Sequence, residues 1–433
     1  MSQSKNILHD QINEPLKSAS STICGIRMIE FFSGIGGMRY GVKQALQQMA
    51  KTASAADQSS SSSSSRNSFK LESCEAYEIS LHANRTYAHN FQEKYSTTTQ
   101  KTSKKSSSST RIPKFSVTTK LVEQLNPEDL DGAADLWTLS PPCQPFTTTK
   151  GAKQLDATDK RNAGIKGLMN ILKVIDQKPK WILLENVKGF VGSQVLSMWY
   201  ETLAQCGYSW KEYLLSPTQV GVPNHRTRYY IICEHNSKRW NNCTLEKGAI
   251  STILPGILEG SGMVNCNVAT CQPLSTYVQC LNDNDVQPYL LSDDTLRKDW
   301  AKELSFVTPE DSITYCFTAA YGRILHKASG SLLLMPVNNS SLATAASTRS
   351  PSASGAIESS TSTSGSQENN MLRYAGRVRR FTPRELLSLF GFPSEFTFPK
   401  DIPLEHQYKL IGNSVNVTVV SRVATELLLP LTL

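Results

Sequence analysis

The chain alternates between short apolar runs and stretches with helical spacing. Residues 26–32 (IRMIEFF) and 181–184 (WILL) have the length and composition of buried strands, and further strands are predicted at 136–139 and 229–233. After the first strand, apolar residues recur at the spacing of one helix face, at Met38, Val42, Ala45, Leu46 and Met49. Strands that alternate with helices predict an α/β fold with a mostly parallel sheet.

A tight glycine turn, SGIGG, joins the first strand to this helix at residues 33–37. Such a turn at the carboxyl end of a strand lets the backbone approach a cofactor closely. The glycines alone are a weak signal, because an ordinary strand-to-helix turn has the same composition.

Glu78 strengthens the cofactor interpretation. It ends the second predicted strand (SCEAYEI) 41 positions after Gly37, and 23 positions after it once the 18 residues of 51–68 are set aside. A nucleoside-type site places an acidic residue about 20 positions after the turn, where it accepts from ribose hydroxyls. A surface glutamate at a strand end is the alternative.

Cys143 lies in an unusually rigid loop, LSPPCQPF, directly after the strand at 136–139. Proline fixes its own φ and restricts the residue before it, so this thiol has few alternative positions. A cysteine that merely fills a core needs no such frame. Glu185 follows the WILL strand, and parallel strands end at the same edge of a sheet, where α/β folds bind ligands. We therefore expect the thiol and the carboxylate to share one cleft.

Arginines form two further groups. Arg226 and Arg228 lead into the strand at 229–233 with an i, i+2 spacing that puts both on one face. The default alternative is that both arginines lie at the surface in contact with water. In a buried location, the pair would need an anionic partner. Residues 382–385 (TPRE) are a capping box that opens a short helix. Five arginines precede or open this helix: Arg373, Arg377, Arg379, Arg380 and Arg384. They suit either a phosphate-contacting patch or a solvated basic face.

Three Ser-rich segments have the composition of disordered insertions, because they contain too little apolar surface to offset chain entropy. They are residues 51–68, 96–111 and 338–370.

Composition adds few constraints to this 433-residue chain. The formal charge of +8 favours a polyanionic partner such as nucleic acid, although many basic proteins have none. The ten cysteines include no Cys-x-x-Cys pair, so free thiols and no zinc site are expected. The N-terminal segment lacks the apolar core of a signal peptide, and no apolar run approaches membrane-spanning length, so no membrane association is expected.

Six motifs in order resemble those of the cytosine-C5 methyltransferases. They are FFSGIGG, SPPCQPF, ENVKGF, PNHRTRYYI, RRFTPRELLSLFGFP and IGNSVNV. The Pro-Pro-Cys and Glu-Asn-Val motifs are a strong signal when found together, and the resemblance covers residues 24–235 and 371–433.

A narrower resemblance concerns Cys316-Phe317-Thr318, which is similar to the signature of the branch that methylates tRNA despite its DNA-methyltransferase ancestry. Asn224, where DNA-modifying relatives usually carry Gln, and a short recognition region agree with it. This branch implies methylation of cytosine 38 in the anticodon loop of aspartate tRNA, in the cytoplasm, the nucleus or both. Cys316 itself is expected to be structural or substrate-contacting, since its sequence neighbours include no activating group.

The resemblance implies a Rossmann-like catalytic domain at 24–235 and 371–433, with a smaller target-recognition domain at 236–337. It implies a covalent mechanism in which a thiolate adds to carbon 6 of cytosine and activates carbon 5. The catalytic residues are then Cys143 as nucleophile, Glu185 on the base, and Arg226 and Arg228 lowering the thiol pKa. The residues expected to bind S-adenosylmethionine are Phe32, Gly34, Ile35, Gly36, Gly37, Glu78, Val122, Glu123, Ser140, Asn413 and Ser414.

One departure and two alternatives accompany this interpretation. Thr148 stands where family members usually carry Arg, with Lys150 and Lys153 as candidate substitutes. A DNA cytosine methyltransferase would share every catalytic residue, and a non-catalytic nucleic-acid-binding protein of the same fold would have lost Cys143 or Glu185. The expected partner is tRNA, with DNA as a weaker one, and the chain is expected to be a monomer.

Overall fold

A computed structural model describes residues 24–57, 69–91, 115–146, 156–240, 250–253, 271–336 and 370–432. The predicted insertion at 96–111, together with Thr148, lies outside the described residues. The prediction for 51–68 is wrong at its start, because helix α1 (Gly37–Asp57) continues through residues 51–57. This stretch, KTASAAD, contains alanines and a lysine, which favour helix. Likewise Asn370, the last residue of the third predicted insertion, begins a 3₁₀ helix.

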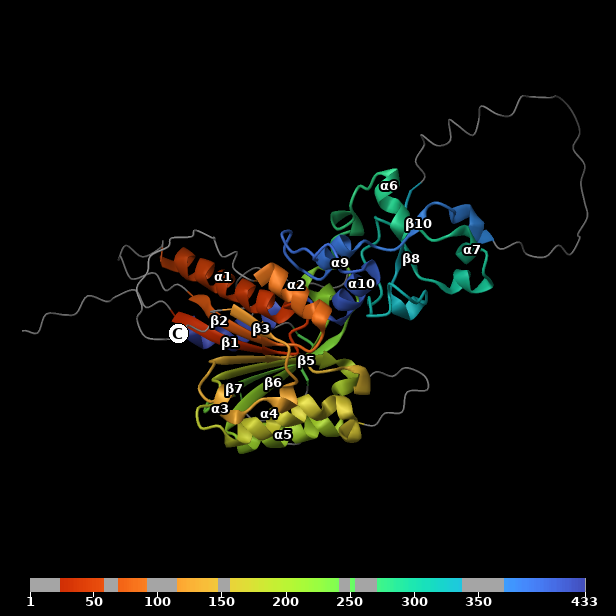
Figure 1. The fold of residues 1–433 in the computed structure, drawn as a ribbon. Coiled ribbons are helices and arrows are strands. Elements are labelled where there is room, and N and C mark those ends of the chain that lie inside the picture. Colours follow the sequence, from red (N-terminus) through yellow and green to blue (C-terminus); the bar gives the residue numbers. More distant parts are fainter. Residues whose placement is uncertain are drawn as a thin grey trace, which may run out of the picture.

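The main sheet has seven strands in the order β3-β2-β1-β4-β5-β7-β6 (Figure 1). Their bounds are β1 Cys24–Phe31, β2 Phe69–Tyr77, β3 Phe115–Thr118, β4 Leu136–Leu139, β5 Trp181–Val187, β6 Tyr208–Leu215 and β7 Arg228–His235. Neighbouring strands from β3 to β5 pair in parallel, whereas β7 runs antiparallel to both β5 and β6. The α/β fold with a mostly parallel sheet is therefore confirmed.

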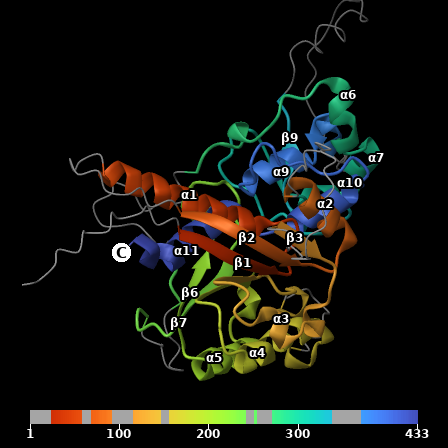
Figure 2. The same ribbon diagram turned by 60° about the vertical axis from the view of Figure 1, so that its left-hand side comes forward.

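Helices cover both faces of this sheet (Figures 1 and 2). Alternate residues of β1 divide between the two layers: Ile26 and Met28 pack with α1 and α11 (Val417–Leu428), and Ile29 and Phe31 pack toward the other face. That face is covered by α3 (Pro127–Leu130), α4 (Ala163–Val174) and α5 (Gln194–Gln205). Because both faces are covered, the central strands β4 and β5 are buried at nearly every position rather than in an alternating pattern.

The C-terminal helices correct one expectation. Helix α10 (Leu404–Asn413) and α11 lie in a segment, Leu404–Leu431, whose length and apolar composition would suffice to span a membrane. Its most apolar window is 61% buried inside the protein, as in a core helix. Asn416, whose side chain accepts from the backbone of Val419, caps the start of α11 after the break at Ser414.

A smaller unit carries a three-stranded sheet of order β10-β9-β8, formed by β8 (Phe306–Val307), β9 (Leu332–Leu334) and β10 (Val378–Arg379). Two short helices, α6 (Asp283–Val286) and α7 (Asp293–Leu296), belong to the same unit. Since β10 pairs with β9, the segment at 378–379 belongs to the smaller unit, although the sequence assigned it to the catalytic domain.

The arginines near residue 380 do not form one surface patch. Arg379 is fully buried and donates two hydrogen bonds to Glu385, at 2.8 and 2.7 Å. Glu385 also completes the predicted capping box with Thr382 at the start of α9 (Pro383–Leu389). Arg384 donates instead to carbonyls beyond the end of α9, including that of Pro393. The two proposed explanations, a phosphate patch and a solvated face, both fail for Arg379, whose charge is used inside the core.

Candidate active site

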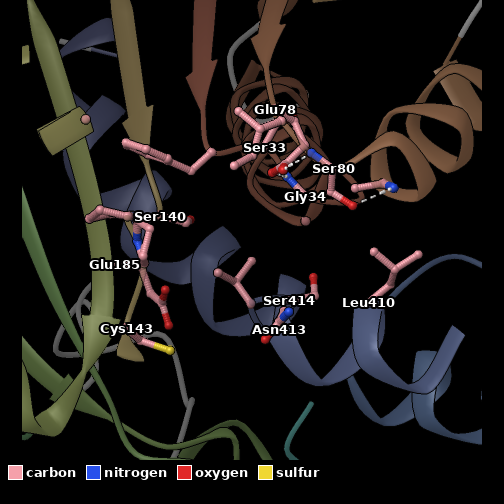
Figure 3. A pocket seen from close by; sticks show the side chains of 18 of the residues that line it. Ser33, Gly34, Glu78, Ser80, Ser140, Cys143, Glu185, Leu410, Asn413 and Ser414 are labelled. Atoms are coloured by element: carbon pink, nitrogen blue, oxygen red, sulfur yellow. Dashed lines mark hydrogen bonds between the residues drawn. The ribbon is translucent and has the colours of Figure 1, made fainter. Parts of the chain in front are cut away.

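A cavity of about 720 Å³ opens at the carboxyl ends of β1, β2, β4 and β5. This volume lies within the range of about 300–1,000 Å³ typical of small-molecule sites. Its wall opposite the strand ends comes from α10 and the residues after it, including Leu410, Asn413 and Ser414 (Figure 3). The cavity therefore joins two parts of the chain that are far apart in sequence.

Cys143 and Glu185 both line this cavity and point into it from the same side (Figure 3). Hydrogen bonds hold the thiol loop in addition to its prolines. Phe146 N donates to Cys143 O at 2.9 Å, and Asn186 Nδ2 donates to Pro141 O at 3.2 Å. The second bond fastens the loop after β4 to the end of β5, so the rigid frame around Cys143 serves to hold the sulfur beside Glu185.

Burial dominates the electrostatics of this pair. Burial raises the pKa of Glu185, and the positive charges of Arg228 and Arg226 only partly oppose the shift. Arg228 Nε lies 3.4 Å from Glu185 Oε1. Burial and then repulsion by Glu185 raise the pKa of Cys143. Arg228 and Arg226 lower this pKa, as expected, but desolvation and the neighbouring carboxylate outweigh them, so the net shift is upward.

The other end of the cavity has the features of a nucleoside site. Glu78 follows β2, and its carboxylate accepts from Gly34 N at 3.0 Å and Ser80 N at 2.8 Å (Figure 3). Each carboxylate oxygen keeps a free lone pair for a ligand hydroxyl. Phe32, with φ of 56°, adopts the left-handed conformation unusual for a non-glycine residue, and its ring contacts Gly164. A Cβ at Gly34 would meet nothing within 4 Å, so the turn presents open backbone to the cavity.

Comparison with known proteins identifies the family to which this fold belongs. Residues 26–428 match the family of C-5 cytosine-specific DNA methylases. The chain belongs to the C-5 cytosine methyltransferase family. It is 27% identical to the human tRNA (cytosine(38)-C(5))-methyltransferase, over 92% of this chain and 97% of that protein. It is 28% identical to a DNA (cytosine-5)-methyltransferase of Dictyostelium discoideum, over 94% and 95% respectively.

A solved structure agrees with this assignment. The crystal structure of a mutant form of Spodoptera frugiperda DNMT2 superposes with a TM-score of 0.63 at 26% identity, covering 93% of this chain and 99% of that one. The resemblance to an enzyme family with a methyltransferase fold, expected from six motifs, is thus confirmed.

Most of the expected C-5 methyltransferase site residues line the cavity. Those on the cofactor side are Phe32, Gly34, Gly37, Glu78, Val122, Glu123, Ser140, Asn413 and Ser414. Arg226 and Arg228 also reach it, on the side of Cys143 and Glu185.

Ile35 and Gly36 do not line the cavity. Ile35 is 1% exposed and packs in the core shared with α9 and α10. Gly36 has φ of 85°, and a Cβ there would lie 2.2 Å from the ring of Phe91. The side chain of Ile35 and the Cα of Gly36 therefore pack away from the cavity, whereas Gly34 and Gly37 line it.

Two residues of the site were not predicted from the sequence. Ile79 lines the cavity and is 61% exposed, an apolar side chain left open beside the nucleoside-type site. Its position directly after the strand-end Glu78 is the signal that could have identified it. Asn186 was read only as part of a motif, whereas its bond to Pro141 positions the thiol loop.

Cys316 lies against an activating pair, contrary to the expectation drawn from its sequence neighbours. Its sulfur accepts from Arg226 Nη1 at 3.4 Å and from Arg228 Nη2 at 3.8 Å. The contact joins segments about ninety residues apart, which no local pattern reveals. Within the described ranges, no group of three or more His, Cys, Asp or Glu side chains is arranged to hold a metal ion.

Proposed function

We propose that this chain transfers a methyl group from S-adenosylmethionine to carbon 5 of cytosine 38 in aspartate tRNA. Membership in the C-5 cytosine methyltransferase family supplies the reaction class. The likeness to the human tRNA (cytosine(38)-C(5))-methyltransferase, together with the Cys316-Phe317-Thr318 segment, supports tRNA as substrate.

The observation that carries the proposal is the convergence of Cys143 and Glu185 on one cavity beside a nucleoside-type site. A thiol nucleophile and a carboxylate on the same pyrimidine are the two groups that addition at carbon 6 requires. The anticodon loop suits this cavity, because an unpaired base is extruded at lower cost than one in a duplex.

Cys143 and Glu185 have different roles in the reaction. Cys143 loses its proton to solvent as its sulfur bonds to carbon 6, and Glu185 holds the amino group and ring nitrogen of the base. Because burial raises the pKa of Glu185, this carboxylate can take up a proton from solvent and share it with the ring nitrogen as negative charge develops on the base. Carbon 5 then takes the methyl group, loses its own proton to water, and the sulfur–carbon bond breaks to release Cys143.

The cofactor end of the cavity fits S-adenosylmethionine. Glu78 offers carboxylate lone pairs to ribose hydroxyls, Ile79 and Val122 offer apolar surface to adenine, and Gly34 offers open backbone. Asn413 and Ser414 close the opposite wall. When bound, S-adenosylmethionine supplies the methyl group from its sulfonium sulfur.

The test is transfer of radiolabelled methyl from S-adenosylmethionine to an aspartate tRNA transcript. Wild-type protein should label this transcript and fail to label one with uridine at position 38. Cys143→Ala should abolish labelling while binding S-adenosylmethionine with a Kd near the wild-type value. Labelling by Cys143→Ala, or equal labelling of both transcripts, would contradict the proposal.

DNA methylation is the second candidate, favoured by the match to a relative named as a DNA (cytosine-5)-methyltransferase. Labelling of duplex DNA in the same assay separates the two substrates. Faster transfer to duplex DNA than to the tRNA transcript would make DNA the substrate and leave the roles of Cys143 and Glu185 unchanged.

A further inference from the structure

Cys316 is brought to the active site by its neighbours in the smaller unit. Thr314 N donates to Pro223 O, and His225 N donates to Thr314 O, both at 2.9 Å. These two bonds align the segment containing Cys316 with the chain that enters β7. As a result, the sulfur of Cys316 lies beside Arg226 and Arg228, which line the cavity, although Cys316 itself does not line it.

Arg226 is a buried cation in need of a counter-ion. It is 4% exposed, and its guanidinium donates to the carbonyls of Phe317, Gly412 and Ser414 at 2.9, 3.0 and 2.6 Å. Among the described residues, it forms no salt bridge with a carboxylate. The carbonyls accept from its two Nη groups, whereas its buried Nε has no hydrogen-bond partner in the part of the chain that the structure describes. None of these contacts neutralises the charge, and an uncompensated buried charge is strongly destabilising.

The sulfur of Cys316 is the group within hydrogen-bonding reach of Arg226 that can carry a negative charge. It accepts from Arg226 at 3.4 Å and from Arg228 at 3.8 Å, so it bridges the two guanidinium groups. Its one further polar contact, at 3.8 Å, is to the carbonyl of Phe317, which would require a protonated thiol. Two charged donors aimed at one sulfur favour the thiolate over this single long contact.

We infer that Cys316 is a thiolate that serves as the counter-anion of Arg226 and Arg228, and is thereby a positioning residue for the catalytic pair. Glu185 faces the same charges from β5 through its salt bridge to Arg228. Two guanidinium cations are then balanced by one thiolate and one carboxylate. Arg228 contacts Cys316 through Nη2 and Glu185 through Nε. These two contacts hold the guanidinium group in place, and it in turn fixes the carboxylate that binds the base.

The titration behaviour of the cluster agrees with this geometry. Burial alone would raise the pKa of Cys316, but the charges and hydrogen bonds of Arg226 and Arg228 lower it below the ordinary value. Burial and Glu185 raise the pKa of Cys143 in the same cluster. Both shifts favour the thiolate at Cys316, which does not line the cavity, over a thiolate at Cys143.

A spectroscopic experiment without substrate tests the charge state directly. Thiolates absorb near 240 nm and thiols do not, so the difference spectrum of wild type minus Cys316→Ser at pH 7 should contain the band of one thiolate. The matched control is Cys280→Ser, since Cys280 is exposed; its difference spectrum should lack the band. Absence of the band for Cys316 would overturn the inference, and this result is independent of whether tRNA is methylated.

Where Cys316→Ser does not fold, iodoacetamide labelling of the wild type, followed by mass spectrometry of the Cys316 peptide, replaces the difference spectrum. Labelling of Cys316 should reach half its maximal rate at a lower pH than labelling of Cys280. The same or a higher half-maximal pH for Cys316 would overturn the inference.

The predicted effect of Cys316 substitutions on methyl-transfer activity rests on the proposed function. Cys316→Ser should lower kcat by about ten- to a hundredfold with a smaller change in KM, since a charge-assisted contact is replaced by a neutral one. Cys316→Asp, which restores an anion, should recover at least half of that loss on a logarithmic scale. Equal activity of the Ser and Asp variants would show that the charge has no role. Failure of the proposed function would appear separately, as labelling by Cys143→Ala.

Discussion

Glu185 on β5 and Arg228 at the start of β7 form a salt bridge across an antiparallel strand pair, with Nε and Oε1 3.4 Å apart. Both side chains are largely buried at the base of the cavity. The bridge is longer than an ideal ion pair, and it leaves the second carboxylate oxygen of Glu185 for a base. Burial raises the pKa of Cys143, and repulsion by the same carboxylate raises it further.

Substitution of Glu185 should therefore move two measurements in opposite directions. Glu185→Gln should lower the rate of methyl transfer by about a hundred- to ten-thousandfold, because the group that assists proton transfer is lost. It should also lower the pKa of Cys143, since the repulsion by the carboxylate is removed. Iodoacetamide labelling of Cys143, followed by mass spectrometry at pH 7.5, should become faster than in wild type.

Glu78→Gln is the control in the same cavity. Glu78 contacts Gly34 and Ser80 rather than the thiol, so its substitution should weaken binding of S-adenosylmethionine and leave Cys143 labelling unchanged. Equal labelling rates in Glu185→Gln and wild type would show that Glu185 does not control the protonation of Cys143.

Alanine substitutions at two positions of the glycine turn should lower the free energy of unfolding by different amounts. Gly34→Ala should cost about 1–2 kcal/mol, because φ is 53° but the added Cβ meets open space. Gly36→Ala should cost more, since φ is 85° and the Cβ would also lie 2.2 Å from the ring of Phe91. Urea unfolding of both variants measures the difference, and equal free energies of unfolding would contradict the packing of Phe91 against the turn.

The buried pair Arg379 and Glu385 should be sensitive to removal of one partner. Arg379→Met should lower the free energy of unfolding by about 3–5 kcal/mol, because Glu385 loses its guanidinium partner in a fully buried site. Adding Glu385→Gln should restore at least about 1 kcal/mol, since the amide carries no charge. A double variant less stable than Arg379→Met would mean that the carboxylate is compensated by its backbone donors alone.

Glu30 should make stability depend on pH. This fully buried carboxyl accepts from Tyr87 OH at 2.9 Å, and burial raises its pKa to about 7 from an ordinary value of 4.5. Between these values the folded protein holds a proton that the unfolded chain releases, so the free energy of unfolding falls as pH rises. The decrease attributable to Glu30 should total roughly 3 kcal/mol between the two pKa values.

Urea unfolding at several pH values between 5 and 7.5 tests this dependence. Glu30→Gln should flatten the decline, because an amide releases no proton, whereas Glu72→Gln at an exposed position on β2 should not change it. The same slope in wild type and Glu30→Gln would show that Glu30 is ionised throughout.

Local patterns in the sequence were sufficient to predict the strands that carry the site. The run WILL, the glycine turn and the proline-framed Cys143 each depend on neighbours in sequence, because strand burial, positive φ and proline stiffness are local properties. The common edge of parallel strands then predicted that Cys143 and Glu185 converge, and the cavity contains both. A turn motif does not show which side chains face the cavity, so the packing of Ile35 in the core could not be predicted.

The sequence by itself determined the fold class and the family, and it predicted Cys143 as the nucleophile. Tertiary structure alone decided the electrostatic state of the site. A pKa depends on the burial of a group and on the charges around it, and Arg226, Arg228 and Cys316 meet only because the smaller unit folds back onto the chain entering β7. Desolvation acts on the assembled cavity rather than on any segment, so no pattern along the chain encodes which of two cysteines carries the charge.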